Sequence, residues 1–166
     1  MAVDARPIGV LFLCTGNSAR SLLAEAALAR RGGARFASHS AGSQPKGEPH
    51  PRTIETLERL GYATSGFASK SWDVFAGDEA PPIDVVITVC GNAANETCPV
   101  WPGAPIRAHW GVEDPAAFEG SADEERAFFE RIHDQLAKKV DALVALDFDG
   151  LPAAELAERI RAIADV

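Results

Sequence analysis

The fold of this chain is decided by the stretch Val10-Leu-Phe-Leu-Cys14-Thr-Gly-Asn-Ser-Ala-Arg20-Ser21, in which an apolar run ends at a cysteine and leads into a helical pattern. Residues 10–13 are typical of a short buried strand. Ser18 is a residue type that caps helices, and the pattern after it repeats Leu and Ala at inward positions. The five residues between Cys14 and Arg20 are therefore expected to form a tight loop from strand to helix.

This loop is suited to bind a tetrahedral oxyanion and to attack it. Its residues are small, so several backbone N–H groups can turn toward one point beside the positive end of the helix dipole. Arg20 can add a two-pronged charged clamp, and the same positive field favours the thiolate form of Cys14. The alternative is that Cys14 is a buried apolar residue with a packing role and no catalytic role. We predict Cys14 as the nucleophile, and the predicted binding residues are Thr15, Gly16, Asn17, Ser18, Ala19, Arg20 and Ser21.

Length, charge and cysteine content narrow the class of protein. A chain of 166 residues is long enough to bury a core and favours one domain, residues 1–166. The net charge of −8 argues against a nucleic acid or an anionic membrane as partner. No apolar run approaches ~20 residues and no signal-peptide pattern is present, so we expect a cytoplasmic protein. Three cysteines, an odd number, argue against a structural disulfide framework and fit a reducing compartment.

Strand and helix patterns alternate along the chain. The predicted strands after the first are residues 34–40, 83–89 and 106–110, and the predicted helices are about 18–31, 53–60, 121–145 and 152–163. This alternation predicts an α/β fold, a four-stranded parallel doubly wound sheet with helices on both faces. Cys14, Cys90 and Asp114 each follow a predicted strand, and parallel strands end at one edge of the sheet. The three residues are therefore expected to share one active site.

Cys90 and Cys98 enclose a polar loop of seven residues after the predicted strand 83–89. The spacing is not that of a zinc knuckle and no second cysteine pair exists, so no metal site is predicted. A dithiol that becomes a disulfide can supply two electrons to an oxyanion, and a loop with Gly and Asn could bring Cys98 to Cys90. The alternative is that Cys90 is a buried strand-end residue and Cys98 an incidental thiol.

The loop from Cys14 to Ser21 resembles that of low-molecular-weight protein tyrosine phosphatases and of the arsenate reductases that share their fold. Further along, Val89-Cys90-Gly-Asn-Ala-Ala-Asn-Glu-Thr-Cys98-Pro99, His109-Trp110-Gly111 and Asp114-Pro115 are similar to the thioredoxin-coupled arsenate reductases. The resemblance runs from about residue 8 to the predicted helix near 121–145. It implies reduction of arsenate to arsenite with no metal or organic cofactor. The implied partner is thioredoxin, with glutaredoxin or a low-molecular-weight thiol as alternatives.

The resemblance also implies a role for each site residue. Cys14 would attack arsenic in the loop that ends at Arg20, and Asp114 would protonate the departing oxygen. Cys90 would then attack the Cys14 sulfur and release arsenite, and Cys98 would take over the disulfide with Cys90. The cysteine pair is one residue further apart than in the best-known members of the family.

Two questions remain open at this point. Some relatives hold a potassium ion near the loop; Asn17, Glu25 and Ser40 match three of its ligands, but Lys70 stands in place of the fourth. We therefore predict no metal and expect Glu25 to pair with Lys70. Two other functions also fit: a tyrosine phosphatase that forms a phosphocysteine at Cys14, and a non-enzymatic module that binds oxyanions or senses redox state.

Overall fold

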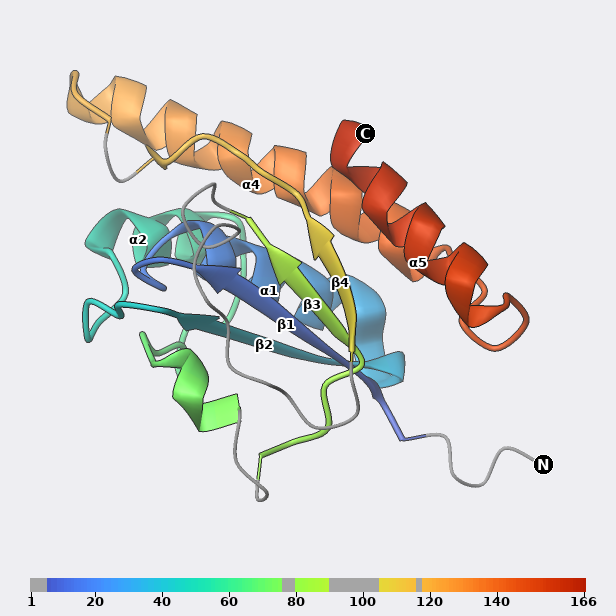
Figure 1. Ribbon diagram of the computed structural model, residues 1–166. Helices are drawn as coiled ribbons and strands as arrows, with labels where there is room; N and C mark the ends of the chain where they lie inside the picture. Colours follow the sequence, from blue (N-terminus) through green and yellow to red (C-terminus); the bar gives the residue numbers. More distant parts are fainter. Residues whose placement is uncertain (1–5, 76–79, 90–104, 116–117) are drawn as a thin grey trace.

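The computed structural model describes residues 6–75, 80–89, 105–115 and 118–166 (Figure 1). Among these residues no helix is both long and apolar enough to cross a membrane. The elements in chain order are β1 (Ile8–Cys14), α1 (Arg20–Gly32), η1 (Gly33–Arg35), β2 (Phe36–Gly42), α2 (Pro51–Arg59), η2 (Trp72–Phe75), β3 (Val85–Thr88), β4 (Ile106–His109), α4 (Ala122–Val144), α5 (Ala153–Ala162) and η4 (Ile163–Asp165).

The predicted four-stranded parallel sheet is confirmed, with the strand order β2-β1-β3-β4. β1 lies inside the sheet and pairs in parallel with β2 from Ile8↔Phe36 to Cys14↔Gly42. On its other side it pairs with β3, and β3 pairs with β4. The chain passes from β1 to β2 on one side and then returns to add β3 on the other side of β1. Ligands of open α/β sheets bind at such a switch in strand order, here between β1 and β3. Cys14, the last residue of β1, lies at this point.

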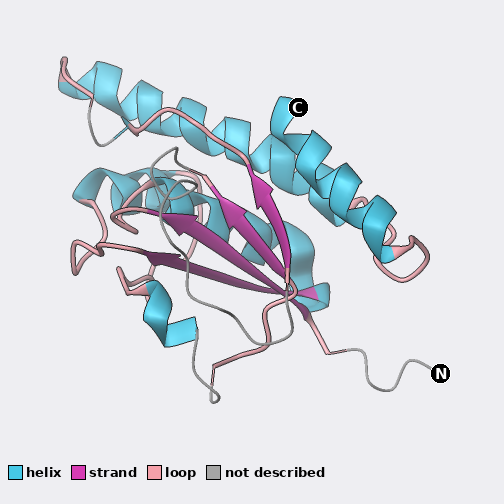
Figure 2. Ribbon diagram, viewed as in Figure 1, coloured by secondary structure: helices cyan, strands magenta, loops and turns pink. Residues whose placement is uncertain are grey.

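The two faces of the sheet bury different parts of the chain. Alternate side chains of a strand point to opposite faces, so Val10 and Phe12 pack with α1, α4 and α5, while Leu11 and Leu13 pack on the other side. Figure 2 shows these helices together on the first face. On the second face, the helical segment that the structure describes is the short η2. β1 is buried on both faces, which explains why its sequence is a continuous apolar run.

The start of α1 differs from the prediction. Ser18 was expected to cap this helix, but the helix begins at Arg20, Ala19 occupies the cap position, and no side chain caps the first turn. The carbonyl of Ser18 instead accepts hydrogen bonds from His50 N at 2.9 Å and Thr53 Oγ1 at 2.8 Å. These bonds to the start of α2 hold Ser18 outside the cap position, and the first N–H groups of α1 are left without a side-chain partner.

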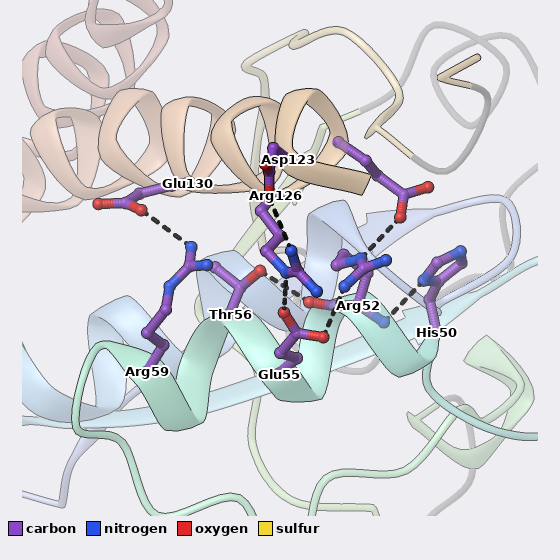
Figure 3. A network of polar contacts seen from close by, with 9 residues as sticks. His50, Arg52, Glu55, Thr56, Arg59, Asp123, Arg126 and Glu130 are labelled. Atoms are coloured by element: carbon purple, nitrogen blue, oxygen red, sulfur yellow. Dashed lines mark hydrogen bonds and ion pairs between the residues drawn. The ribbon is translucent and has the colours of Figure 1, made fainter. Parts of the chain in front are cut away.

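A network of ion pairs fastens α2 to α4 (Figure 3). Arg52 lies at its centre and contacts Glu125 of α4 and Glu55 of its own helix, both at 2.6 Å. Glu55 also accepts from Arg126 of α4 at 2.7 Å, and Arg59 pairs with Glu130 at 2.9 Å. Because His50 and Thr53 at the start of α2 hold the Ser18 carbonyl, this network also fixes one wall of the loop after β1.

The opposite end of the sheet is held by the carboxylate of Asp84. It accepts from Gly9 N at 2.8 Å and from both terminal nitrogens of Arg6 at 2.7 and 2.8 Å. Burial by itself would raise the pKa of Asp84, but the hydrogen bonds from Arg6 and Gly9 lower the pKa below its ordinary value. The charged form of Asp84 therefore favours the folded chain.

Asp84→Asn is expected to lower the free energy of unfolding at pH 7 by about 1 kcal/mol, because the charge-assisted hydrogen bonds are lost. The pKa of Asp84 is lower in the folded chain, so its contribution is present above the pKa of the unfolded chain and is lost as the pH falls through the folded pKa. The difference between parent and variant should shrink below about pH 4 in urea unfolding series. Asp73→Asn, on the exposed surface of η2, is the control and should leave the pH profile unchanged. A constant difference at all pH values would contradict this assignment.

Candidate active site

A hollow of about 270 Å³ opens at the carboxyl edge of the sheet, beside the end of β1. The structure brings together most of the predicted site residues, and the lining consists of Cys14, Thr15, Gly16, Ser18, Ala19, Arg20, Gln44, Lys46 and Asp114. The predicted residues Asn17 and Ser21 are buried and do not line the hollow. Cys90 and Cys98 lie outside the described residues. Gln44 and Lys46 also line the hollow and were not predicted from the sequence. The available signal was that their polar segment follows β2, which ends at the same edge of the sheet as β1.

The backbone of the loop is oriented by the segment that follows β2. Three loop carbonyls accept hydrogen bonds from this segment: Gln44 N to Thr15 O at 2.9 Å, Lys46 N to Gly16 O at 3.0 Å and His50 N to Ser18 O at 2.9 Å. No cis peptide occurs in the described parts of the chain, and in a trans peptide the N–H points opposite to the carbonyl. The N–H groups of residues 16, 17 and 19 therefore point to the inner side of the loop, where an oxyanion would find donors.

Asn17 fixes the shape of the loop. Its backbone has a φ of 46°, in the left-handed region, and its side chain is fully buried. The amide Nδ2 donates to Ser21 Oγ at 2.8 Å and Ser40 Oγ at 3.0 Å, and Oδ1 accepts from Lys70 N at 2.8 Å. Both amide hydrogens are used, so one side chain ties the loop to α1, to β2 and to the segment before η2.

The thiol of Cys14 lies against the hydroxyl of Ser21. The Sγ and Oγ atoms are 3.0 Å apart, and Cys14 is only 3% exposed. Because Ser21 Oγ already accepts from Asn17, its own hydrogen is available to donate to the sulfur. A donor in this position stabilises a thiolate, the form of cysteine that acts as a nucleophile.

Arg20 and Asp114 meet at the same hollow. Arg20 Nη2 lies 3.4 Å from Asp114 Oδ2, and Arg20 Nη1 donates to the carbonyl of Val112 at 3.2 Å. The Arg20 side chain is 15% exposed and that of Asp114 is 40% exposed. The segment after β4 therefore orients the guanidinium and also brings a carboxyl group to the site, where it is open to solvent and to a substrate.

Behind the loop, a buried carboxylate and an ammonium share the hydroxyl of Ser40. Ser40 Oγ donates to Glu25 Oε1, and Lys70 Nζ lies 3.5 Å from Ser40 Oγ. Burial raises the pKa of Glu25, although the Ser40 hydrogen bond and the charge of Lys70 act in the opposite direction. Burial also lowers the pKa of Lys70, against the attraction of Glu25. The expected pairing of Glu25 with Lys70 is thus indirect: the two groups attract each other, but they form no direct ion pair and are bridged by the Ser40 hydroxyl.

No metal cluster is evident in the parts of the chain that the structure describes: they contain no group of three or more His, Cys, Asp or Glu side chains placed to hold an ion. The prediction that the protein uses no metal remains a prediction.

Gly42, at the end of β2, is a further site residue that the sequence reasoning did not identify. A Cβ atom added to Gly42 would lie 2.5 Å from Thr15 O and 3.0 Å from both Cys14 O and Asn17 N. Only glycine leaves room for the loop backbone to approach β2 this closely. The available signal was a glycine at the end of a predicted strand, which by itself does not say what approaches it.

Comparisons of the sequence and of the structure with known proteins place this chain among the same group of relatives. Residues 9–159 match the family model described as low molecular weight phosphotyrosine protein phosphatase. The chain is 37% identical to the arsenate reductase of Bacillus licheniformis over 131 residues, 79% of this chain and 91% of the relative. A solved arsenate reductase in its oxidised state is 30% identical, with a TM-score of 0.67 over 82% of this chain and 96% of that one. The thioredoxin-dependent arsenate reductase of Corynebacterium glutamicum is also 30% identical, with a TM-score of 0.57 over 83% and 64% of the two chains.

Gly42→Ala is expected to displace the loop, because the added methyl group meets backbone atoms that cannot rotate away. The binding of sulfate, measured by calorimetry, should weaken at least about tenfold, and the free energy of unfolding should fall by about 1–3 kcal/mol. Ser43→Ala is the matched control, because the Ser43 hydroxyl is buried and has no hydrogen-bond partner among the described residues. Unchanged sulfate binding in Gly42→Ala would show that the loop does not depend on this contact.

Ser21→Ala is expected to slow the alkylation of Cys14 by iodoacetamide at neutral pH about tenfold, because the thiolate loses a hydrogen bond worth about 1.5 kcal/mol. The rate should be followed on the Cys14 peptide by mass spectrometry, so that the other two cysteines do not contribute. Ser38→Ala removes a hydroxyl that bonds the Glu25 carbonyl instead, and should leave the rate unchanged. Equal rates in both variants and the parent would exclude Ser21 as the donor to the sulfur.

Proposed function

This chain belongs to the low molecular weight phosphotyrosine protein phosphatase family, and from that premise we propose that it is an arsenate reductase that uses three cysteines in turn. The observation that carries the proposal is the convergence of Cys14, Arg20 and Asp114 on one hollow, in a chain 37% identical to an arsenate reductase. The loop supplies the anion site, and the Cys90 and Cys98 pair supplies the electrons that a phosphatase does not need.

The first step joins sulfur to arsenic. Arsenate binds to the loop N–H groups and to the guanidinium of Arg20. The Cys14 thiolate forms an S–As bond while one As–O bond breaks. The departing hydroxide takes a proton from the carboxylic acid form of Asp114 and leaves as water. The exposure of Asp114 on the hollow and its contact with Arg20 support this role.

The second step reduces arsenic. The Cys90 thiolate attacks the Cys14 sulfur, so an S–S bond forms and the S–As bond breaks. The electron pair of the broken bond stays on arsenic, which changes from the +5 to the +3 state and leaves as arsenite. The two sulfur atoms are oxidised to a disulfide, so no metal or organic cofactor is required.

The last steps return the protein to its starting state. The Cys98 thiolate attacks the Cys90 sulfur and releases the Cys14 thiolate, which leaves a Cys90–Cys98 disulfide. A dithiol protein of the thioredoxin class then reduces this disulfide and becomes oxidised itself. The relative from Corynebacterium glutamicum, named as thioredoxin-dependent, supports that choice of reductant over glutaredoxin or a small thiol. Because the relay needs reduced thiols, we propose that the protein works in the cytoplasm. We also propose that residues 1–166 form one domain.

A single turnover without added thiol tests the relay. Reduced protein mixed with an equal amount of arsenate is expected to release close to one arsenite per chain and to protect Cys90 and Cys98 from alkylation. Cys98→Ser should still release arsenite but should stop with a Cys14–Cys90 disulfide, seen by mass spectrometry. Cys90→Ser should release less than about a hundredth as much, because no thiol is placed to attack the Cys14 sulfur.

The same experiment separates the proposal from its alternatives. Three free thiols and no arsenite in the parent protein would overturn the reductase proposal, and hydrolysis of an aryl phosphate would then indicate a phosphatase. Arsenite release from Cys90→Ser at the parent level would instead contradict the assigned order of the cysteines.

A further inference from the structure

Lys46 adds a second positive charge to the lining of the hollow. Three of the lining residues carry a charged side chain: Arg20, Lys46 and Asp114. Arg20 is close to Asp114, at 3.4 Å, so much of its charge is already matched. Within the described residues Lys46 forms no such pair. When Cys14 is a thiolate and Asp114 a carboxylate, the lysine is what keeps the lining from being negative overall.

The position of Lys46 is set by its own backbone and by the loop. Its N–H donates to the carbonyl of Gly16 at 3.0 Å. The methylene groups of its side chain lie over Gly16, where a Cβ atom would be 3.2 Å from Cε and 3.4 Å from Cγ. The ammonium group is one bond beyond Cε, so it lies close to the anion loop.

Lys46 also lines a second hollow of about 280 Å³, which adjoins the first and shares Ser18 with it. The other residues of the second hollow are Glu48, Pro49, His50 and Pro51. The lysine therefore stands between the anion loop and the adjoining surface. Glu48 brings a negative charge to the second hollow only, whereas in the first hollow Lys46 stands beside Arg20 and the anion loop. An anion that passes from the second hollow to the first therefore stays close to the charge of Lys46.

We propose that Lys46 is an anion-capture residue that gives this site its affinity for doubly charged tetrahedral oxyanions. The inference rests on the proposed function for its substrate, arsenate, but the capture of the anion can be measured without any reduction. A chain with a net charge of −8 repels a dianion at long range, and a local cation at the mouth of the site opposes that repulsion. Arg20 then holds the anion for attack, while Lys46 acts on its entry and retention.

The test uses Lys46→Met, which keeps the length of the side chain and removes the charge. Sulfate serves as the probe, and the readout is its protection of Cys14 from iodoacetamide, followed on the Cys14 peptide. The sulfate concentration for half-protection should rise about tenfold in Lys46→Met. Lys46→Arg should stay within about twofold of the parent. Lys138→Met, on the exposed surface of α4, makes the same change in net charge away from both hollows and should match the parent.

Steady-state reduction of arsenate gives a second readout. Lys46→Met should raise the KM for arsenate about tenfold with kcat within about twofold, the result of lost binding in both ground state and transition state. Higher salt should reduce the difference between parent and variant, because salt screens the charge.

The outcomes separate this inference from the proposed function. Unchanged sulfate protection in Lys46→Met, or a fall in kcat with unchanged KM, would overturn the role of Lys46 even if arsenate is reduced. A tenfold loss of protection in a protein that releases no arsenite would uphold capture by Lys46 and overturn the reductase proposal instead. The rate of Cys14 alkylation without sulfate shows in each variant whether the loop has kept its structure. If Lys46→Met fails to fold, Lys46→Gln carries the same prediction.

Discussion

The hydrogen bonds of the Asn17 amide are the interaction on which the site depends. Each hydrogen of the amide and its oxygen has a partner, and the three partners belong to α1, β2 and the segment before η2. The bond to Ser21 directs a hydroxyl hydrogen to the sulfur of Cys14. The bond to Ser40 connects the loop to the buried pair of Glu25 and Lys70. A side chain that does not line the hollow thus sets the position of the groups that do.

The start of α1 lacks a capping side chain, which lowers the stability of the helix and leaves N–H donors for an anion. A helix normally satisfies its first N–H groups with a side chain, which is worth about 1 kcal/mol. Here that contribution is absent, and the donors remain available to an anion. The helix is held instead by the burial of Leu23 and Leu28 in the core that α4 shares. By contrast α4 has a complete capping box at Ser121 and Glu124.

The sequence predicted those features that depend on neighbours in the chain. The apolar run of β1 and the spacing from Cys14 to Arg20 are local, so both the central strand and the anion loop could be identified. Asp114 could be placed because parallel strands end at one edge. Gly42 and Lys46 could not, because their roles depend on which backbone approaches them in space. The capping role predicted for Ser18 was wrong for the same reason, since its carbonyl is held by α2.

Cys14 is buried at the end of an internal strand, and this limits which reductants can contact its sulfur. Cys14 is paired with Gly42 of β2, and Leu13 before it is paired on both sides, so the backbone that carries the sulfur is fixed in the sheet. At 3% exposure it admits a small ion but excludes the surface of another protein. In the proposed reaction the oxidising equivalents must therefore be carried outward by thiols that belong to the same chain. A protein reductant cannot reach the Cys14 sulfur directly, so the disulfide has to be moved to a position on the same chain that such a reductant can reach.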